Sequence, residues 1–156
     1  MHRHAIRAVL LTPQGLVLLM RFREPASGQE LWLTPGGGLA AGEHPVVCLR
    51  RELREETGLE AFHLGPQLWM RRHTFCWAGR NITQQEIYYL VETERFDPTM
   101  KANPEAVETE AFRGFRWWDV SEILESGDLF VPRRLGAYLQ ELIQHGPPPQ
   151  PFDVGI

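Results

Sequence analysis

Apolar and polar positions along the chain follow two periods, one typical of strands and one typical of helices. Two apolar runs near the start, AIRAVLLT (5–12) and LVLLMRF (16–22), are separated by the turn-forming letters PQG. Their Val and Leu content predicts two strands joined by a tight hairpin. LWLT (31–34) predicts a short third strand, which stops at Pro35 and the glycines after it.

Helical periods lie between and after the strand-like runs. Pro45 suits a first helical turn because its φ is fixed, and Gly58 is typical of the residue that follows a helix, so we expect a helix of about three turns between them. Ser121 predicts the start of a short helix. A last amphipathic helix is expected from about Pro132 to Gln144. Its apolar face consists of Leu135, Leu139, Leu142 and Ile143.

The second half of the chain contains three further strand-like runs: PQLWMRRHTFCW (66–77), ITQQEIYYLVETE (82–94) and FRGFRWWDV (112–120). Strands mixed with two or three helices predict the α/β class, with a sheet covered by helices. The Pro-rich end GPPPQPFDVGI cannot continue a helix. We therefore expect one domain over residues 1–145 and a tail over 146–156 that is either mobile or laid along a partner.

Composition and charge narrow the function classes. The chain has 156 residues, of which 43% are hydrophobic and 10% aromatic, enough for one domain with a sizeable core. A net charge of -4 without a basic run argues against a nucleic-acid polymer as partner. No apolar run approaches about twenty residues, so no membrane partner is expected. Cys48 and Cys76 form no metal-binding or disulfide pattern, which favours reduced thiols and a cytoplasmic location.

The segment RELREE, inside the first expected helix, contains Glu52, Glu55 and Glu56. At about 100° per residue the three side chains share one face, and the apolar stripe with Leu49 and Leu53 lies beside it. The ordinary interpretation is a solvated acidic face. However, like charges at positions i and i+4 destabilise a helix, and apolar neighbours add a desolvation cost. A divalent cation such as Mg²⁺ would relieve both, so we expect a metal site here.

Three consecutive glycines (36–38) precede this helix and follow a strand. Glycine lets backbone groups approach a ligand closely, although turns also use glycine often. A P-loop is excluded, because no Lys followed by Ser or Thr comes after the glycines. The glycines support a ligand site without defining it.

The spacing of these residues resembles the Nudix box. Every defined position of that motif is filled, by Gly37, Glu43, Arg51, Glu52, Leu53, Glu55, Glu56, Gly58 and Leu59. The order of the expected elements also resembles the Nudix α/β/α sandwich with a mixed β-sheet, over most of the chain up to the Pro-rich tail.

The resemblance implies a hydrolase that uses Mg²⁺ or Mn²⁺ to cleave a nucleoside diphosphate linked to another moiety, so a small-molecule nucleotide is the expected substrate. In the family, glutamates matching Glu52, Glu55 and Glu56 bind metals or help to deprotonate the attacking water. A backbone carbonyl of the glycine loop, here Gly36 or Gly37, commonly completes the metal coordination.

Arg51 and Glu43 resemble the ion pair that orients the catalytic glutamates in this family, so Arg51 is grouped with the catalytic residues and Glu43 with their support. An ordinary surface pair is the alternative. Upstream, Arg21 at a strand end could reach a phosphate, although solvent or a salt bridge is the ordinary fate of such an arginine. Trp32 could stack a base, and a core position is its alternative.

Nudix enzymes often supply a further carboxylate from beyond the box. Glu110 is the favoured candidate, because it lies on the irregular approach to a strand, and Glu108 is second. Glu86 alternates with apolar residues and is expected to face solvent. Simple solvation is the alternative for Glu110.

The resemblance leaves the substrate and the oligomeric state open. The proline that accompanies ADP-ribose hydrolysis is absent from RRHTFCWAG (71–79), and Trp77 stands where a tyrosine accompanies dinucleoside polyphosphate hydrolysis. The motifs of NADH and coenzyme A hydrolases are missing too. The alternative from another class is a Nudix-like module that binds a nucleotide without cleaving it, which the intact glutamates disfavour. A homodimer is not excluded.

Overall fold

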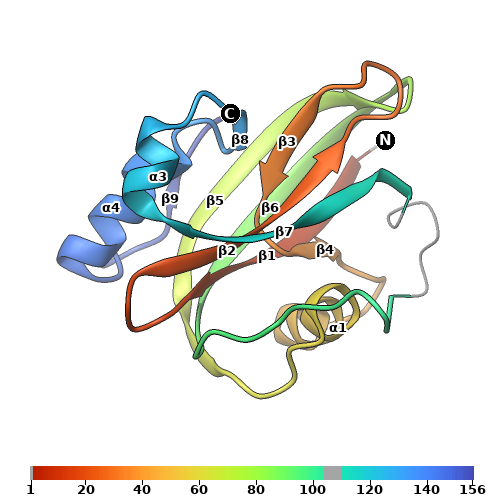
Figure 1. Cartoon of the computed structure of the whole chain (residues 1–156). Coiled ribbons are helices and arrows are strands. Elements are labelled where there is room, and N and C mark those ends of the chain that lie inside the picture. Colours follow the sequence, from red (N-terminus) through yellow and green to blue (C-terminus); the bar gives the residue numbers. More distant parts are fainter. Residues whose placement is uncertain (1, 104–109) are drawn as a thin grey trace.

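The elements alternate along the chain much as the hydrophobic pattern predicts (Figure 1). The structure is a computed structural model and describes residues 2–103 and 110–156. Its strands are β1 (His2–Leu11), β2 (Leu16–Arg23), β3 (Glu30–Leu33), β4 (Gly36–Gly38), β5 (His63–Trp77), β6 (Arg80–Glu92), β7 (Phe112–Asp119), β8 (Phe130–Val131) and β9 (Phe152–Asp153). Within these residues the helices are α1 (Pro45–Thr57), α3 (Val120–Glu125) and α4 (Leu135–His145).

A mixed sheet divides into two branches. β1 and β2 pair beside their turn, where Leu11 faces Val17. Beyond that point β1 pairs in parallel with β6 and antiparallel with β4, while β2 pairs antiparallel with β3 and β7. β5 continues the first branch along β6, and β8 continues the second along β3. The strand order β8-β3-β2-β1-β6-β5-β9 confirms the expected mixed sheet and α/β class.

Helix α1 covers one face of the first branch, below the sheet in Figure 1. Successive residues of a strand point to opposite faces, so Ile6, Ala8 and Leu10 of β1 all face this helix. They pack with Leu49 and Leu53 of α1 in one buried cluster. The odd-numbered side chains of β1 point to the other face of the branch.

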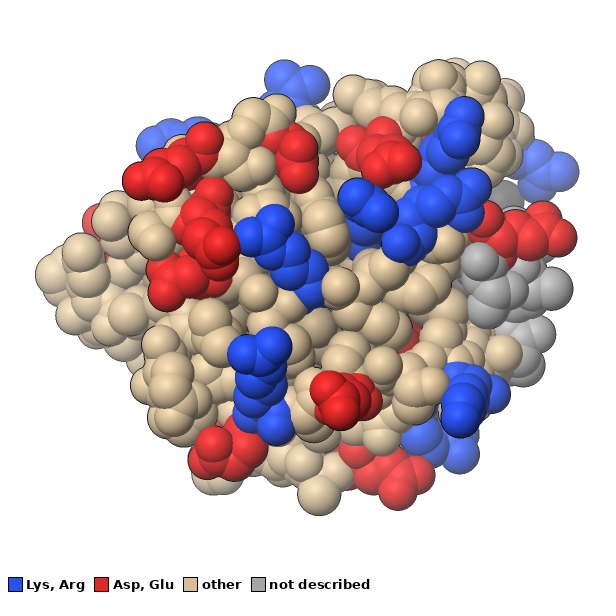
Figure 2. All heavy atoms as spheres, in the orientation of Figure 1, with Lys and Arg blue, Asp and Glu red and all other residues tan. Residues whose placement is uncertain are grey.

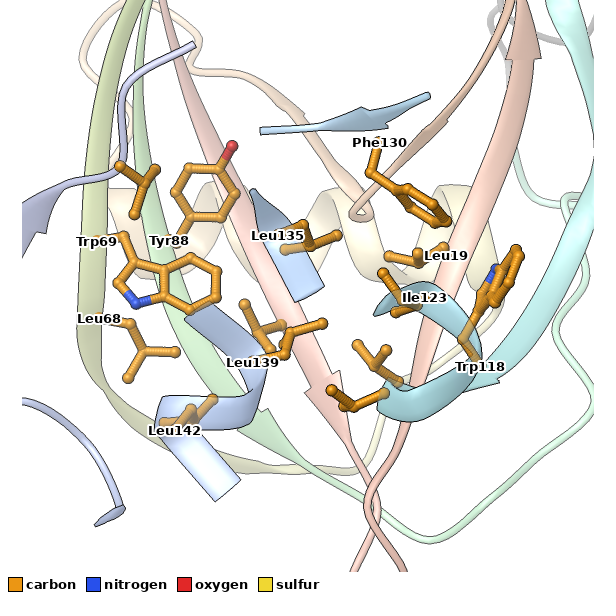
Figure 3. Close-up of a cluster of buried hydrophobic side chains, with 14 of the residues drawn as sticks. Leu19, Leu68, Trp69, Tyr88, Trp118, Ile123, Phe130, Leu135, Leu139 and Leu142 are labelled. Carbon is orange, nitrogen blue, oxygen red and sulfur yellow. The ribbon is translucent and has the colours of Figure 1, made fainter. Parts of the chain in front are cut away.

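Helices α3 and α4 pack on the opposite face, at the left of Figure 1. Figure 3 shows the cluster that they form with the sheet, in which aromatic and leucine side chains converge from strands and helices. Its members include Leu19, Leu68, Trp69, Tyr88, Trp118, Ile123, Phe130, Leu135, Leu139 and Leu142. Burial of large apolar side chains on both faces of the sheet drives this three-layer arrangement.

Two details of these helices differ from the sequence expectations. Asp119, not Ser121, caps α3: its carboxylate accepts from the Ser121 amide at 3.0 Å, and the Glu122 side chain accepts from the Asp119 amide at 2.9 Å. This reciprocal capping box satisfies two backbone donors at once, which a start at Ser121 would not. Ile143 of α4 is 44% exposed, since the buried stripe comprises Leu135, Leu139 and Leu142.

The Pro-rich tail packs on its own domain, so neither a mobile tail nor one laid along a partner describes it. β9 pairs in parallel with β5, and the Val154 side chain is only 4% exposed. The Tyr138 hydroxyl donates to the Val154 carbonyl at 3.3 Å. The prolines end the preceding helix, but they do not prevent Val154 after them from being buried against the domain.

Charge is distributed without a dominant sign on the face shown in Figure 2, where acidic and basic side chains are interspersed. Both cysteines are free thiols, Cys48 buried and Cys76 exposed. Among the described residues, no helix combines the length and the apolar character needed to cross a membrane.

Candidate functional site

Helix α1 is fixed at both ends by local interactions. His44 caps its N-terminus, because its Nδ1 accepts from the Val46 amide at 3.1 Å, and Pro45 occupies the first turn. At the other end Gly58 adopts φ 80°, and its amide donates to the Arg54 carbonyl at 3.0 Å. The helix therefore runs over the residues that the sequence predicts.

Strand β4 lies so close to its neighbours that side chains would not fit. At Gly36, where φ is 142°, a β carbon would lie 2.1 Å from the Ile6 carbonyl oxygen. At Gly37 a β carbon would lie 2.5 Å from the Glu52 carboxylate. The glycines therefore make room for a carboxylate of α1 directly against the backbone of β4.

The acidic face of α1 points toward this glycine strand, not toward solvent. Glu52 is 6% exposed and Glu56 is 3% exposed. Glu56 Oε1 accepts from the Gly36 amide at 3.1 Å. Burial of two carboxylates four residues apart carries the electrostatic cost that the sequence pattern anticipates. A simple solvated face is thus ruled out for Glu52 and Glu56.

Arg51 joins the carboxylates of α1 to the loop before the helix. Its guanidinium forms two parallel bonds with Glu43, Nε to Oε2 at 2.9 Å and Nη2 to Oε1 at 3.0 Å. Nη1 contacts Glu52 Oε1 at 2.9 Å and Glu55 Oε2 at 3.5 Å, and Nη2 also donates to the Gly38 carbonyl at 3.1 Å. Arg51 therefore positions two of the three glutamates and the end of β4 together.

The Arg51–Glu43 pair holds both groups in their charged forms. Hydrogen bonds from Arg51, followed by the bond from the Ala40 amide, lower the pKa of Glu43 to about 2. The hydrogen bond with Glu43 raises the pKa of Arg51 above its already high ordinary value. Arg51 and Glu43, which the sequence predicts to orient the catalytic glutamates, therefore belong to one charged network with Glu52.

The oxygen donors beside β4 fit a hard divalent cation in kind, since Mg²⁺ and Mn²⁺ prefer carboxylate and carbonyl oxygens. The space that a β carbon would fill at Gly37 is taken by the Glu52 carboxylate, and the buried Cys48 thiol lies 3.8 Å from the Gly37 carbonyl oxygen. Over residues 2–103 and 110–156, however, no three His, Cys, Asp or Glu side chains converge as metal ligands. Arg51 draws Glu52 and Glu55 to itself, so cation binding requires these carboxylates to turn.

A cleft of about 360 Å³ opens beside the glycine strand, between the two branches of the sheet. Gly36, Gly37 and Glu56 line one end of it. The rest of its wall comes from both branches and includes Arg3, Arg7, Phe22, Leu33, Phe75, Trp77, Ile82, Gln84 and Ala111. A second cavity of about 220 Å³ adjoins it and shares Arg7, Leu33, Phe75, Trp77 and Gln84. The two hollows therefore lie side by side and share part of their lining, and the cleft is the one that reaches Glu56.

Three charged side chains line the second cavity: Arg71 and Glu86 are buried, and Arg7 is partly buried and also lines the cleft. Glu86 accepts from Arg7 Nε at 2.7 Å and from Arg71 Nη1 at 2.5 Å, and Gln84 and Tyr88 donate to the same carboxylate. Arg7 Nη1 also donates to the Gly36 carbonyl at 3.1 Å. Glu86 is 3% exposed, so the expectation that it faces solvent is wrong. Glu86 shares a face of β6 with Tyr88 and Leu90, and this face is covered by the cluster that α3 and α4 form with the sheet.

Opposite charges keep Arg7 and Glu86 ionised. Burial lowers the pKa of Arg7, but the charge of Glu86 more than offsets this effect and the pKa rises above its usual value. Burial raises the pKa of Glu86, yet the charges of Arg7 and Arg71 hold it below its usual range. The trio is therefore a fixed charged element beside the cleft.

Two expected substrate-binding residues lie elsewhere. Arg21 and Trp32 face each other across β2 and β3, and they line a separate hollow that shares no residue with the cleft at Glu56. Arg21 Nε lies 3.4 Å from Glu30 Oε2. Trp32 is buried, its Nε1 donates to Asp128 at 3.1 Å, and its ring packs edge-on against Trp118. These contacts match the salt-bridge and core alternatives that the sequence left open.

The carboxylate candidates beyond the box separate into three cases. Glu110 is exposed and is followed by Ala111, which lines the cleft beside Glu56. Glu108 lies outside the described residues. Glu86 is committed to its two arginines. Glu110 thus stays a prediction, with a position next to the cleft in its favour.

Sequence reasoning missed the pocket side of the cleft, above all Arg7, Arg71, Phe75 and Glu86. A signal was present: charged residues interrupt otherwise buried strands in AIRAVLL and QEIYYLV. Charges are rarely buried unless they are paired. Without the register of β1, β5 and β6, however, the pattern cannot show that these three charges meet.

Comparison with known proteins agrees with this geometry. The family described as NUDIX domain matches residues 1–138. Phosphatase NudJ of Escherichia coli strain K12 is 31% identical over 130 residues, which cover 83% of this chain and 76% of that protein. A MutT protein from Methanosarcina mazei Go1 has a similar fold, with a TM-score of 0.63 and 18% identity, over 92% of this chain and 94% of that one.

The NUDIX domain of Shewanella oneidensis NrtR, solved in complex with ADP ribose, also shares the fold. Its TM-score is 0.65 at 20% identity, and the match covers 92% of this chain and 89% of that chain. The α/β/α arrangement around a mixed sheet is therefore the Nudix fold. Since the family match covers most of the chain and a curated relative agrees with it over 130 residues, the chain belongs to the Nudix hydrolase family.

Proposed function

We propose that the protein hydrolyses a pyrophosphate bond in a nucleoside diphosphate linked to another moiety, such as a nucleoside triphosphate or a nucleotide sugar, and that it uses Mg²⁺ or Mn²⁺. One observation carries the proposal: the glycines of β4 bring the carboxylates of Glu52 and Glu56 against the backbone at the end of a cleft. The ADP ribose bound by the NrtR domain, an organic group on a diphosphate, gives support from a protein of the same fold.

Carboxylates of Glu52, Glu55 and Glu56, with a carbonyl of Gly36 or Gly37, would hold the cation. When bound, a divalent cation neutralises phosphate oxygens and lowers the pKa of water. One of the three glutamates would accept the proton of the attacking water, whose oxygen bonds to one phosphorus while the bond from that phosphorus to the bridging oxygen breaks and the other phosphate leaves. The cation-holding residues thereby also orient the reaction.

Arg51 serves this mechanism through the glutamates it contacts. Its bidentate pair with Glu43 leaves Nη1 directed at Glu52 and Glu55. When these carboxylates turn toward a cation, Arg51 would remain anchored to Glu43 and to the Gly38 carbonyl, so its positive charge would stay beside them.

Glu110 would supply the additional carboxylate near the cleft. It precedes Ala111 in the wall of the cleft, and its own carbonyl accepts from Arg113 Nη1 at 2.6 Å, which fixes the local backbone. Arg21 and Trp32 line a hollow that is separate from the cleft, so they are assigned no contact with the substrate.

The same proposal places the enzyme in a reducing compartment such as the cytoplasm, in keeping with its two free thiols. Its partner is a small nucleotide, and a homodimer is compatible with it. Neither statement affects the chemistry at the glutamates.

The experiment is a panel of nucleoside triphosphates, oxidised nucleoside triphosphates, nucleotide sugars, ADP-ribose and dinucleoside polyphosphates, each incubated with Mg²⁺ or Mn²⁺. Release of mononucleotide and phosphate or pyrophosphate is followed, and a chelator serves as the control. We expect cation-dependent turnover of at least one compound. Binding without turnover of any compound would instead favour a module that senses a nucleotide and does not cleave it.

A further inference from the structure

The charged trio of Arg71, Glu86 and the partly buried Arg7 lies outside the glutamate site, in the cavity that adjoins the cleft. All three residues line the smaller cavity of about 220 Å³, and Arg7 also lines the cleft at Glu56. Buried ion pairs contribute little net stability compared with apolar packing, so their presence beside a cavity calls for a role other than holding the fold.

Arg71 carries a hydrogen-bond donor that the rest of the protein leaves unused. Its side chain is 4% exposed and bonds through Nη1 to Glu86. Its buried Nε–H has no acceptor among the residues that the structure describes. An unsatisfied buried donor costs about 1–3 kcal/mol, so such a group in a cavity wall points to an acceptor supplied from outside the chain.

The wall around Arg71 suits a flat ring. Phe75 and Trp77 supply aromatic side chains, and Leu31, Leu33 and Val131 supply aliphatic ones. The cavity is smaller than the roughly 300–1,000 Å³ of pockets that enclose whole drug-sized ligands, so it accepts one ring system and not a whole nucleotide. An arginine donates hydrogen bonds and never accepts them, so the ring must present an oxo group or a bare ring nitrogen.

We propose that Arg71 is the specificity-determining residue of this enzyme, and that its Nε–H donates to an oxo group or ring nitrogen on the heterocycle attached to the diphosphate. This inference rests on the proposed function, because it places the phosphates at the glycine end of the cleft and the ring in the adjoining cavity. Five residues line both hollows, so the cavity lies directly beside the cleft.

Glu86 is the positioning residue for this contact. It lies opposite Arg71 in the β5–β6 register and accepts a hydrogen bond from Arg71 Nη1. The Nε edge of the Arg71 guanidinium is thereby left for the ring. Its second oxygen holds Arg7, whose Nη1 reaches the Gly36 carbonyl. The Glu86 carboxylate therefore links Arg71, which would contact the ring, through Arg7 to strand β4 beside the glutamates.

The test compares Arg71→Lys with wild type on the nucleotide that the panel identifies as the best substrate. Lysine keeps the positive charge beside Glu86 but lacks the Nε–H and the planar fork. We expect KM to rise about 10- to 100-fold, as for loss of a charged hydrogen bond, while kcat changes by less than about 3-fold. Arg72→Lys is the matched control, since Arg72 is the exposed neighbour on β5 and should leave both constants unchanged.

A second measurement needs no variant. Wild type labelled with ¹⁵N-arginine is titrated with the nucleoside monophosphate of the best substrate, which carries the ring but no pyrophosphate to cleave. An Nε–H signal protected from solvent exchange should shift on titration. An unchanged KM in Arg71→Lys, or protected Nε–H signals that stay fixed at saturation, would overturn the inference while leaving the proposed function intact. If wild type turned over no compound of the panel, the proposed function would fail first, and the inference with it.

Discussion

Two glycines set the distance between helix α1 and strand β4, and they therefore decide where the carboxylates lie. Gly36 is required by the approach of β4 to the Ile6 carbonyl, and Gly37 by the approach of the Glu52 carboxylate. The sequence could predict that the three glutamates share a helix face, because that follows from helical geometry alone. It could not predict that the Arg51 guanidinium already contacts two of these carboxylates, those of Glu52 and Glu55.

Replacement of Gly37 by alanine should displace the Glu52 carboxylate, since the new β carbon would lie 2.5 Å from it. We expect a fall in kcat/KM of about 10- to 100-fold, as for a shift of roughly 1 Å in a catalytic group. The matched control is Gly127→Ala, where a β carbon meets nothing within 4 Å and should leave activity unchanged. Equal activity in both variants would show that Glu52 has no fixed role.

The Glu43–Arg51 pair should make stability depend on pH in a defined window. The pKa of Glu43 is about 2 in the folded protein against an ordinary value of 4.5. A depressed pKa contributes stability above 4.5, and this contribution is lost as pH falls from 4.5 through 2. The difference in unfolding free energy between wild type and Glu43→Gln should therefore be constant above this window and shrink within it.

Denaturant unfolding at a series of pH values measures that difference. Glu60→Gln, at an exposed position just after α1, should follow the wild type throughout. A gap between wild type and Glu43→Gln that persists unchanged to pH 2 would argue against an ionised pair that stabilises the loop.

At the level of elements, the sequence predicts features that depend on neighbouring residues, such as helix ends. It does not predict features that depend on strands far away in the sequence. Pro45 and Gly58 delimit α1 because caps act over one helical turn. Glu86 was placed wrongly, since alternation along β6 says which residues share a face but not which face is covered. The tail was misjudged for the same reason, because its partner strand β5 lies far away in the sequence.

The tail should contribute measurably to stability through Val154, which is buried against the domain. Val154→Ala removes two buried methyl groups, and we expect a loss of about 1.5–3 kcal/mol in unfolding free energy. Val47→Ala on the exposed side of α1 makes the same chemical change and should stay within about 0.5 kcal/mol of wild type. If both variants unfold at the same denaturant concentration, β9 is not part of the folded core.

At the level of the whole molecule, the α/β class and the order of elements followed from hydrophobic periodicity and turn residues. The division of the sheet into two branches did not, because it depends on long-range pairing of β1 with β6 and of β2 with β7. The cleft is a consequence of that division, and so are the buried charges in its wall. The boundary proposed at residue 145 stays a prediction.

The central claim is that the carboxylates of α1 hold a divalent cation for hydrolysis. Its most direct test is the hydrolysis rate of the best substrate as a function of Mg²⁺ concentration, for wild type, Glu56→Gln and the control Glu60→Gln. The wild-type rate should rise from zero in chelator to a plateau, Glu60→Gln should follow it, and Glu56→Gln should stay at least about 100-fold below at saturating Mg²⁺. Full activity of Glu56→Gln, or a wild-type rate that ignores the chelator, would contradict the account.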